Sequence, residues 1–371
     1  MRVAAVVVAW NAADHLPACL AALDAQDHDD LEVVVVDNAS TDGTAQVLDT
    51  TLRSATRHRC RVVANGTNRG FAGGVNDALA VVDAEAVLLV NPDVVAASDV
   101  VSRCVAALEA DAGRGSIQPR LHRGATGGRG PSSVDDGPGR VAPVTDATGA
   151  PVIDTTGHVL TRARLLRNRG EGEGDHGQYE TPGEVFGASG ALVLHRRAML
   201  DDVAWRHPDG HLEHLTEDLF AYYDDVELDW RARLRGWSAW YEPGAVAVHE
   251  RGGAGPRRTA RVEALNWANR LLVIATCDDR GSLVRSLPLV VSTTALKTLE
   301  MALTVPSAVV PALRRLSLLP RCRARRRQLL RRATVPIASV PARWAVPFRW
   351  RPWITSWWRR VTGHVTGGRA E

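Results

Sequence analysis

The chain has 371 residues, 45% of them hydrophobic, which favours a folded protein with a sizeable core and excludes a disordered chain. Its five cysteines contain no CxxC pair, so neither a zinc cage nor a disulfide framework is indicated and a reducing, cytosolic setting is expected. The formal net charge is +3, but from residue 311 onward there are fifteen arginines and one acid, which leaves −11 for the residues before it.

Apolar runs and helical spacing alternate along the first hundred residues. Strands are expected at residues 3–9, 33–36, 61–64 and 87–90, and helices at residues 16–23, 44–52 and 75–82. The first run is too short for a signal peptide and lacks a cleavage-like end, so a buried strand is expected there. Strands that alternate with helices predict an α/β fold, with a mainly parallel sheet covered on both faces.

The middle of the chain combines a loop signal with further elements. Residues 122–150 are rich in Gly, Pro, Ser and Asp, which predicts a mobile surface loop. Strand-like segments return at residues 185–194, a helix is expected at about 226–234, and a last strand or hairpin at 237–248.

After about Val262 the composition changes. Residues 283–319 are apolar but interrupted by Lys297, Glu300 and several prolines, so no run reaches the roughly 20 residues of a spanning helix. The Arg-rich end also carries five tryptophans: Trp344, Trp350, Trp353, Trp357 and Trp358.

This basic end predicts an anionic partner. Arginines with interfacial tryptophans favour a segment that lies on a membrane surface. The alternative is a helical subdomain with a solvated basic face. Nucleic acid is disfavoured, because no recognised binding module accompanies the arginines.

Two predicted strands end in a carboxylate. Asn91-Pro92-Asp93 follows the fourth strand; all three are turn formers, but Asp93 could also bind a metal or a charged ligand at a strand's carboxyl end. Asp37 ends the second strand and could accept the imide N–H of a uracil or thymine base. The alternative for Asp37 is that it satisfies the amides of its own loop.

Three further stretches carry weaker signals. In NRGFAGGVNDAL, the glycines allow a close backbone approach to a ligand and Arg69 offers a charge suited to a diphosphate. In FAYYDDVELDW, Asp224 or Asp225 could take a proton from an attacking hydroxyl, or could simply favour the positive end of a helix. His249 follows an apolar strand, where a lone histidine is usually structural.

In order, the stretches VVVAWN, VVVVDNASTDGT, NRGFAGGVNDAL, VLLVNPDVV, FGASGALVLHRRAM, YYDDVELDWRARLRGW and VAVHERGG resemble inverting family 2 glycosyltransferases of the GT-A fold. The resemblance is greatest to the bacterial rhamnosyltransferase-like group. It implies a Rossmann-like GT-A catalytic domain over residues 1–262. Residues 263–371 would then be a helical, Arg/Trp-rich membrane-associating region.

The resemblance implies roles for particular residues. The nucleotide-sugar site would comprise Ala9, Trp10, Asn11, Asp37, Asn68, Arg69, Gly70, Gly73, Asn91 and Asp93. Asp93 and His249 would hold Mg²⁺ or Mn²⁺, although the usual Asp-x-Asp motif is here Asn-Pro-Asp. Asp225 would be the catalytic base. The donor-sugar and acceptor site would be formed by Gly187, Ser189, Gly190 and Asp224, the last in place of the usual glutamate.

The implied reaction transfers L-rhamnose from dTDP-rhamnose to a hydroxyl of a saccharide or polyprenyl-linked acceptor, in cell-envelope polysaccharide synthesis. The enzyme would be cytoplasmic and peripheral on the inner face of the membrane. Another donor, UDP-galactofuranose or UDP-glucose, is the first alternative. A nucleotidyltransferase would want a Gly-rich, basic loop after the first strand, where AWNAADHL stands. A non-catalytic sugar-binding scaffold is disfavoured by the co-occurrence of Asp37, Asp93, Asp225 and His249.

Overall fold

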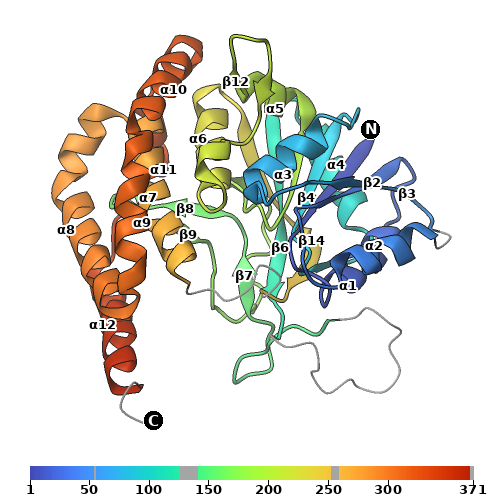
Figure 1. Cartoon of the computed structure of the whole chain (residues 1–371), viewed down its shortest axis with the longest axis horizontal. Coiled ribbons are helices and arrows are strands. Elements are labelled where there is room, and N and C mark those ends of the chain that lie inside the picture. Colours follow the sequence, from blue (N-terminus) through green and yellow to red (C-terminus); the bar gives the residue numbers. More distant parts are fainter. Residues whose placement is uncertain (54–55, 126–140, 252–258, 368–371) are drawn as a thin grey trace. The chain divides into compact units, whose positions relative to one another are not determined.

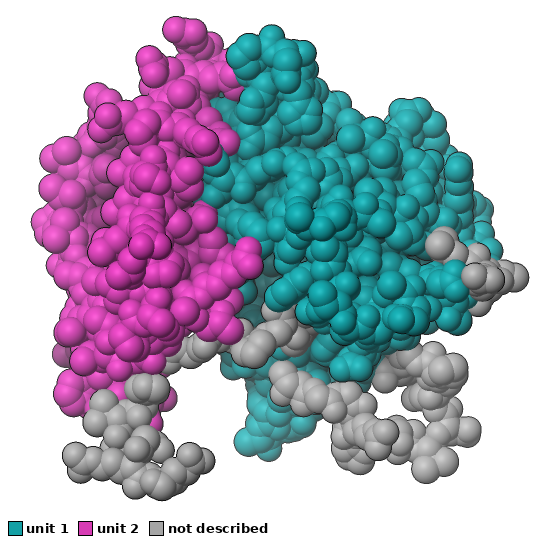
Figure 2. Space-filling model, in the orientation of Figure 1, with its two compact units in different colours: residues 1–158, 168–255 teal, residues 159–167, 256–371 magenta. Residues whose placement is uncertain are grey.

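A computed structural model describes residues 1–53, 56–125, 141–251 and 259–367 (Figure 1). The chain divides into two compact units (Figure 2). The first comprises residues 1–158 and 168–255, and the second comprises residues 159–167 and 256–371. Most of the loop predicted at 122–150 lies outside the described residues, since 126–140 are not described. The domain boundary predicted after residue 262 stays a prediction.

The first unit is an α/β fold. Its main sheet contains β1 (Val3–Ala9), β2 (Leu31–Asp37), β3 (Arg59–Ala64), β4 (Ala86–Val90), β5 (Val94–Ala96), β6 (Arg114–Arg123), β7 (Ile153–Thr155), β10 (Gly183–Val185), β11 (Leu192–Arg196) and β14 (Ser238–His249). A small separate sheet pairs β12 (Trp205–Arg206) with β13 (Leu212–Glu213). The helices are α1 (Leu16–Asp24), α2 (Thr44–Arg53), α3 (Gly70–Leu79), α4 (Val100–Glu109), α5 (Arg197–Val203), the 3₁₀ turn η1 (Glu217–Leu219) and α6 (Asp224–Leu234).

The main sheet has the strand order β10-β14-β6-β11-β4-β1-β2-β3, with β5 and β7 paired to β14 and β6. Strands β3, β2, β1 and β4 are parallel to one another. Strand β11 is antiparallel to both of its neighbours, β4 and β6, so β6 and its parallel partner β14 run in the same direction as the first four. The prediction of a mainly parallel sheet is therefore confirmed.

Alternate residues of β1 pack into two cores, as the period of a strand requires. Val3, Ala5 and Val7 join the core formed with α1, α2 and α4. Ala4 and Val6 join the core formed with α3, α5 and α6 on the opposite face. Every residue of this strand is buried, which explains why it appears in the sequence as an unbroken apolar run.

Helix α3 begins five residues before its predicted start. The glycine-rich stretch lies inside the helix because α3 packs closely on the sheet: a Cβ on Gly74 would lie 2.6 Å from Val8. The segment predicted at 185–194 splits into β10 and β11, with a connecting turn between them. The predicted strand or hairpin at 237–248 is one strand, β14.

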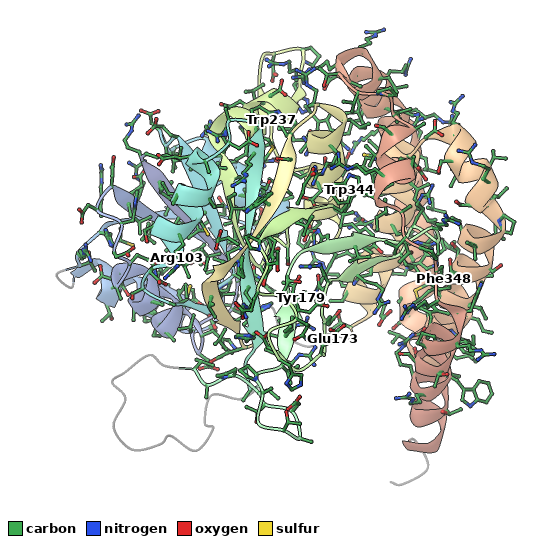
Figure 3. All side chains as sticks on the ribbon, turned by 180° about the vertical axis from the view of Figure 1, so that it is seen from behind. Arg103, Glu173, Tyr179, Trp237, Trp344 and Phe348 are labelled. Atoms are coloured by element: carbon green, nitrogen blue, oxygen red, sulfur yellow. The ribbon has the colours of Figure 1, made fainter. Side chains whose placement is uncertain are left out.

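Aromatic and charged side chains cover the edge of the sheet near β10. The Tyr179 hydroxyl donates to Glu173 Oε2 (3.0 Å), and both side chains are labelled in Figure 3. The Arg169 guanidinium stacks over the rings of Tyr179 and Tyr241. These contacts hold the segment between β9 and β10 against β14.

The second unit is helical, as the sequence predicted. Its helices are α7 (Ala260–Cys277), α8 (Arg280–Thr304), α9 (Val309–Arg315), α10 (Leu319–Arg332), α11 (Ser339–Trp344) and α12 (Trp350–Gly367), with 3₁₀ turns η2 (Pro306–Ala308) and η3 (Leu316–Leu318). A hairpin of β8 (His158–Leu160) and β9 (Leu166–Asn168) supplies its residues 159–167. Among the described residues, no helix combines the length and apolar character that crossing a membrane requires.

Ion pairs and a hydrogen bond to the backbone connect the hairpin and the helices of this unit. Arg164 donates to Asp278 (2.7 Å), with both side chains almost fully buried. Arg270 donates to the carbonyl oxygen of Ala163. Glu300 of α8 accepts from Arg360 of α12 (2.6 Å), which joins these two helices.

Candidate active site

The carboxylates predicted to form the site lie along one edge of the main sheet. Asp37 is the last residue of β2 and pairs in register with Ala9, the last residue of β1. Asp93 follows β4, whose last residue Val90 pairs with Val7 of β1. Because these strands are parallel, their carboxyl ends meet at the same edge.

Residues after β1 and β2 form one continuous loop surface. The Asn11 side-chain oxygen accepts from the Thr41 backbone N–H (2.8 Å). Asp37 Oδ1 accepts from the Ser40 N–H (2.9 Å), so this carboxylate does satisfy an amide of its own loop. Trp10 next to them is 39% exposed, which leaves a large aromatic surface available to a ligand.

The start of α3 is held against the loop before α6. Asn68 Oδ1 accepts from the Gly70 N–H (2.8 Å). Gly70 has a φ of +74°, and a Cβ there would collide with the Phe220 carbonyl oxygen. Arg69 donates to both oxygens of Glu217 (2.9 Å each) and also pairs with Asp77, so two carboxylates fix its guanidinium. Gly73 packs on Arg69, where a Cβ would lie 2.7 Å from the arginine Cβ.

Both interpretations of Asn91-Pro92-Asp93 find support in the geometry. The Val94 N–H donates to the Asn91 carbonyl (3.1 Å), which closes a turn. The Asp93 side chain is buried within this turn, and its Oδ1 lies 3.3 Å from His249 Nε2. The other nitrogen of His249, Nδ1, lies 2.9 Å from Asp154 Oδ2.

Burial alone would lower the pKa of His249. The hydrogen bonds to Asp154 and Asp93 outweigh it and raise this pKa to about 9. The imidazole is therefore held by a carboxylate on each side. A carboxylate behind a histidine is the arrangement that fixes the orientation of a metal-binding imidazole.

Asp93 and His249 fit a divalent ion as a two-residue ligand set once the ion displaces the proton on His249 Nε2. One carboxylate oxygen and one imidazole nitrogen converge, with Asp154 behind the ring. Within residues 1–53, 56–125, 141–251 and 259–367, no group of three or more His, Cys, Asp or Glu side chains is arranged to hold a metal. A bound ion would thus take its remaining ligands from water or from substrate oxygens, as Mg²⁺ commonly does.

Asp224 and Asp225 begin α6 and differ in environment. The Asp225 side chain is 26% exposed, and its Oδ2 accepts from the Gly190 N–H (3.2 Å). Asp224 is buried, and burial together with the charge of Asp225 raises its pKa to about 8. The raised pKa favours the protonated form of Asp224, and the more exposed carboxylate of the two is Asp225.

The turn between β10 and β11 brings the predicted glycines to α6. The Ser189 N–H donates to Gln118 Oε1 (2.7 Å), and the Ala188 N–H donates to Asp229 Oδ1 (3.1 Å). Gly187 faces Asp229 so closely that a Cβ would overlap its carboxylate. The Asn91 N–H donates to the Ala191 carbonyl (2.8 Å), which links this turn to the Asp93 loop.

The structure therefore gathers the predicted residues along one edge of the sheet, while their roles stay predictions. Three residues of this region were absent from the predicted site: His158, Asp154 and Asp229. Asp229 could have been found, because it lies four residues after Asp225 on the same helix face. His158 and Asp154 lie in or beside three-residue strands that give no periodic signal.

Comparisons with known proteins agree with this architecture. The model of the family "Glycosyl transferase family 2" matches residues 4–170, a little under half of the chain. Among curated proteins, no relative was found.

Solved structures resemble the chain at low sequence identity. GalNAc-T7 with UDP, GalNAc and Mn²⁺ has a TM-score of 0.57 and 11% identity, covering 93% of this chain and 58% of that chain. The mannosyltransferase PcManGT from Pyrobaculum calidifontis, in complex with GDP-Man and Mn²⁺, has a TM-score of 0.49 and 18% identity. The similarity covers 92% of this chain and 87% of that chain. S. aureus TarS 1–349 with UDP-GlcNAc has a TM-score of 0.43 and 15% identity, covering 88% and 92%.

At such low sequence identities, the structural similarity shows only that the fold is shared. This fold is of the GT-A glycosyltransferase type. The match over residues 4–170 covers β1 to β9 and with them Asp37, Asp93 and the glycines of α3. Residues 4–170 therefore match the model of a glycosyl transferase family 2 domain, and this match together with the fold supports a glycosyltransferase enzyme.

Proposed function

We propose that the enzyme transfers a sugar, L-rhamnose from dTDP-rhamnose, with inversion to a hydroxyl of a saccharide or lipid-linked acceptor in cell-envelope polysaccharide synthesis. The choice of rhamnose rests on the resemblance of its motifs to the rhamnosyltransferase-like group. GalNAc-T7, which shares the fold, binds UDP, a sugar and Mn²⁺ in its solved structure. That supports a nucleotide-sugar as the donor.

One observation carries the proposal: an accessible carboxylate and a buried carboxylate–histidine pair occur along the same edge of the sheet. Asp225 is the accessible group, and its orientation is fixed by the Gly190 N–H. Asp93 and His249 form the buried pair. A base and a polar group that faces the diphosphate are the two elements that sugar transfer from a nucleotide requires.

In the proposed reaction, the acceptor hydroxyl attacks the anomeric carbon as the bond from that carbon to the diphosphate oxygen breaks. Asp225 takes the proton of the attacking hydroxyl, so the new glycosidic bond forms without an oxonium product. Asp37 accepts a hydrogen bond from the base of the donor, and Trp10 packs beside it. A divalent ion bound by Asp93 and His249 would offset charge on the leaving diphosphate.

Substitution of Asp225 tests the proposed base. Asp225→Asn keeps the shape and the bond to Gly190 but cannot accept a proton as a carboxylate, so turnover falls by about 10²–10⁴-fold. Donor binding survives. Asp209→Asn, an exposed aspartate in a loop of the same unit, is the matched control. Near-normal turnover of correctly folded Asp225→Asn would show that another group is the base.

Substitution of Asp93 tests the proposed metal pair. Asp93→Ala removes one of the two ligands, so the thermal shift produced by Mn²⁺ with dTDP or UDP becomes smaller or disappears. His249→Ala gives the same result by removing the other ligand. A metal titration that is unchanged in both variants would contradict this assignment.

The donor sugar is tested with a panel of three donors. Hydrolysis or transfer is followed with dTDP-rhamnose, UDP-galactofuranose and UDP-glucose under the same conditions. The proposal expects the highest kcat/KM with dTDP-rhamnose. Preference for a UDP-sugar would replace rhamnose by that sugar and leave the role of Asp225 intact.

We further propose that the second unit docks on an anionic membrane surface at the cytoplasmic face. Exposed apolar side chains recur along α8 at helical spacing: Val284, Leu287, Val291, Leu299 and Leu303. Helix α12 exposes Trp350, Ile354 and Trp358 on one face. Apolar faces and tryptophans beside many cations fit the interface of an anionic bilayer.

Three arginines of α10 provide the test. Arg323, Arg327 and Arg331 are exposed and follow one another at four-residue spacing, so they share a helix face. Changing all three to Gln should weaken binding to phosphatidylserine vesicles by about 100-fold, at about 1 kcal/mol for each charge. The control is a second triple variant in which Arg2, Arg57 and Arg59 of the first unit are changed to Gln. Equal vesicle binding by both triple variants would refute the docking proposal.

A further inference from the structure

One buried histidine touches the proposed base without reaching solvent. His158, at the start of β8, is 3% exposed. Its Nδ1 lies 2.7 Å from Asp229 Oδ2, and its Nε2 lies 3.5 Å from Asp225 Oδ2. The imidazole therefore stands between two carboxylates of α6.

The ring is fixed by its surroundings. Asp225 and Asp229 are four residues apart, so they project from the same face of the helix. Asp229 accepts from the Ala188 N–H, and the His158 N–H donates to the Gly187 carbonyl (2.9 Å). Turning the ring would break its 2.7 Å contact with Asp229, which supplies the orienting bond.

We propose that His158 is a positioning residue for Asp225: Asp229 orients the imidazole, and the imidazole holds the Asp225 carboxylate ionised and in place to receive the acceptor's proton. This inference rests on the proposed role of Asp225. It assigns to His158 no contact with substrate. It also explains why a buried histidine is placed beside a cluster of acids.

The electrostatics around the ring point the same way. The charged groups that face it are Asp225, Asp229 and Asp224 of α6, while the turn between β10 and β11 presents backbone groups. Burial alone would lower the pKa of His158, but these carboxylates outweigh it and raise the pKa above its usual value. A cation at this position favours the ionised form of a neighbouring carboxyl.

Without that cation, Asp225 would face the Asp229 carboxylate with no positive charge between them. Like charges at short range disfavour ionisation, so the ionised form of Asp225 would lose its stabilising partner. A base with a higher pKa becomes protonated, and therefore inactive, at a higher pH. Loss of the imidazole charge should thus move the acidic limb of the pH–rate profile upward.

Two substitutions separate charge from structure. His158→Gln places a neutral amide near the position of Nε2, while His158→Asn places one near Nδ1 and can keep a bond to Asp229. Both remove the charge. His195→Gln is the control, because His195 is equally buried and its Nδ1 lies 2.9 Å from Ser116 Oγ, away from the carboxylates of α6.

The experiment measures kcat against pH for the intact enzyme with the fastest donor of the panel. In both His158 variants the acidic limb moves up by about one pH unit or more, the size of shift that an opposite charge produces. The KM for the donor stays within about twofold, and the His195→Gln limb stays in place. A limb that does not move in either folded His158 variant overturns the inference.

A second measurement needs no substrate. In ¹⁵N-histidine-labelled protein, the resonance that disappears in His158→Gln should titrate above about pH 6.5, and its midpoint should fall in Asp225→Asn. If the titration midpoint of this resonance is the same in Asp225→Asn as in the parent enzyme, the inference is also overturned. If Asp225→Asn remains active, the proposed base is wrong; if it is inactive while the His158 profiles are unchanged, only the role of His158 fails.

Discussion

Gly187→Ala should be far more damaging than Gly190→Ala, although the two glycines lie three residues apart in the same turn. A Cβ on Gly187 would lie 2.6 Å from Asp229 Oδ1 and closer still to Cγ and Oδ2. Non-bonded heavy atoms normally stay about 3.5–4.0 Å apart. The carboxylate of Asp229 must therefore move. On Gly190, the nearest atoms to a new Cβ lie at 3.5–3.7 Å, which is ordinary contact.

The magnitude follows from the bonds that Asp229 would lose. It accepts from the Ala188 N–H (3.1 Å) and lies 2.7 Å from His158 Nδ1. Hydrogen bonds to charged groups contribute about 1.5–3 kcal/mol each, so losing both costs about 3–6 kcal/mol of unfolding free energy. Gly190→Ala should change stability by less than about 1 kcal/mol, because a tolerated Gly→Ala change also restricts the unfolded chain.

Urea unfolding followed by tryptophan fluorescence measures both variants against the parent chain. The expected difference between them is several kcal/mol at an unchanged m-value. Equal unfolding midpoints for Gly187→Ala and Gly190→Ala would show that Asp229 adjusts freely, and the close packing described for this turn would then be unimportant to stability.

Further predictions concern neighbouring groups. Arg231→Met leaves the fully buried Glu227 without its 2.8 Å partner and should cost about 3–5 kcal/mol in urea unfolding. The double variant with Glu227→Met should recover the part of this loss that comes from the unpaired carboxylate, but not the part that comes from the bonds of Arg231 to the Val203 and His214 carbonyls; strictly additive losses would contradict this. Burial raises the pKa of Asp224 to about 8, so the folded chain holds a proton that the unfolded chain releases near pH 4, and stability from this group falls as pH rises from 4 to 8. Asp224→Asn should therefore stabilise the protein more at pH 8 than at pH 5, and equal gains at both pH values would disprove it. Asp154→Asn removes the carboxylate behind His249 and should weaken Mn²⁺ binding with dTDP by about 10–100-fold in calorimetry; unchanged affinity would rule out that support.

Much of the fold could be predicted because buried parallel strands are continuous apolar runs. The runs at β1 and β4 contain only buried residues, and the predicted strands lie within a few residues of the observed ones. The short strands β5, β7 and β10 have three residues each, too few to show a period. The sequence does not predict the early start of α3, because glycines usually indicate a loop, whereas here they allow a helix to lie close to the sheet.

The edge of the sheet where the site lies was predictable for the same reason. Asp37 ends β2 and Asp93 follows β4, and topology alone brings the carboxyl ends of such parallel strands together. His158 and Asp154 could not be found this way. Each is a single polar residue whose neighbours come from distant segments, α6 for His158 and the end of β14 for Asp154. Only tertiary packing gives these residues a partner.

The chain crosses between its two units three times, because residues 159–167 belong to the helical unit while the sequence on either side belongs to the other. No single cut can therefore separate the two. A fragment that ends at residue 255 would keep this short insert but lose Asp278 and Arg270. Arg164 would then lose the ion pair with Asp278, and the Ala163 carbonyl would lose its bond from Arg270. Anyone dissecting the enzyme should either keep α7 and α8 or replace the nine-residue insert by a plain linker.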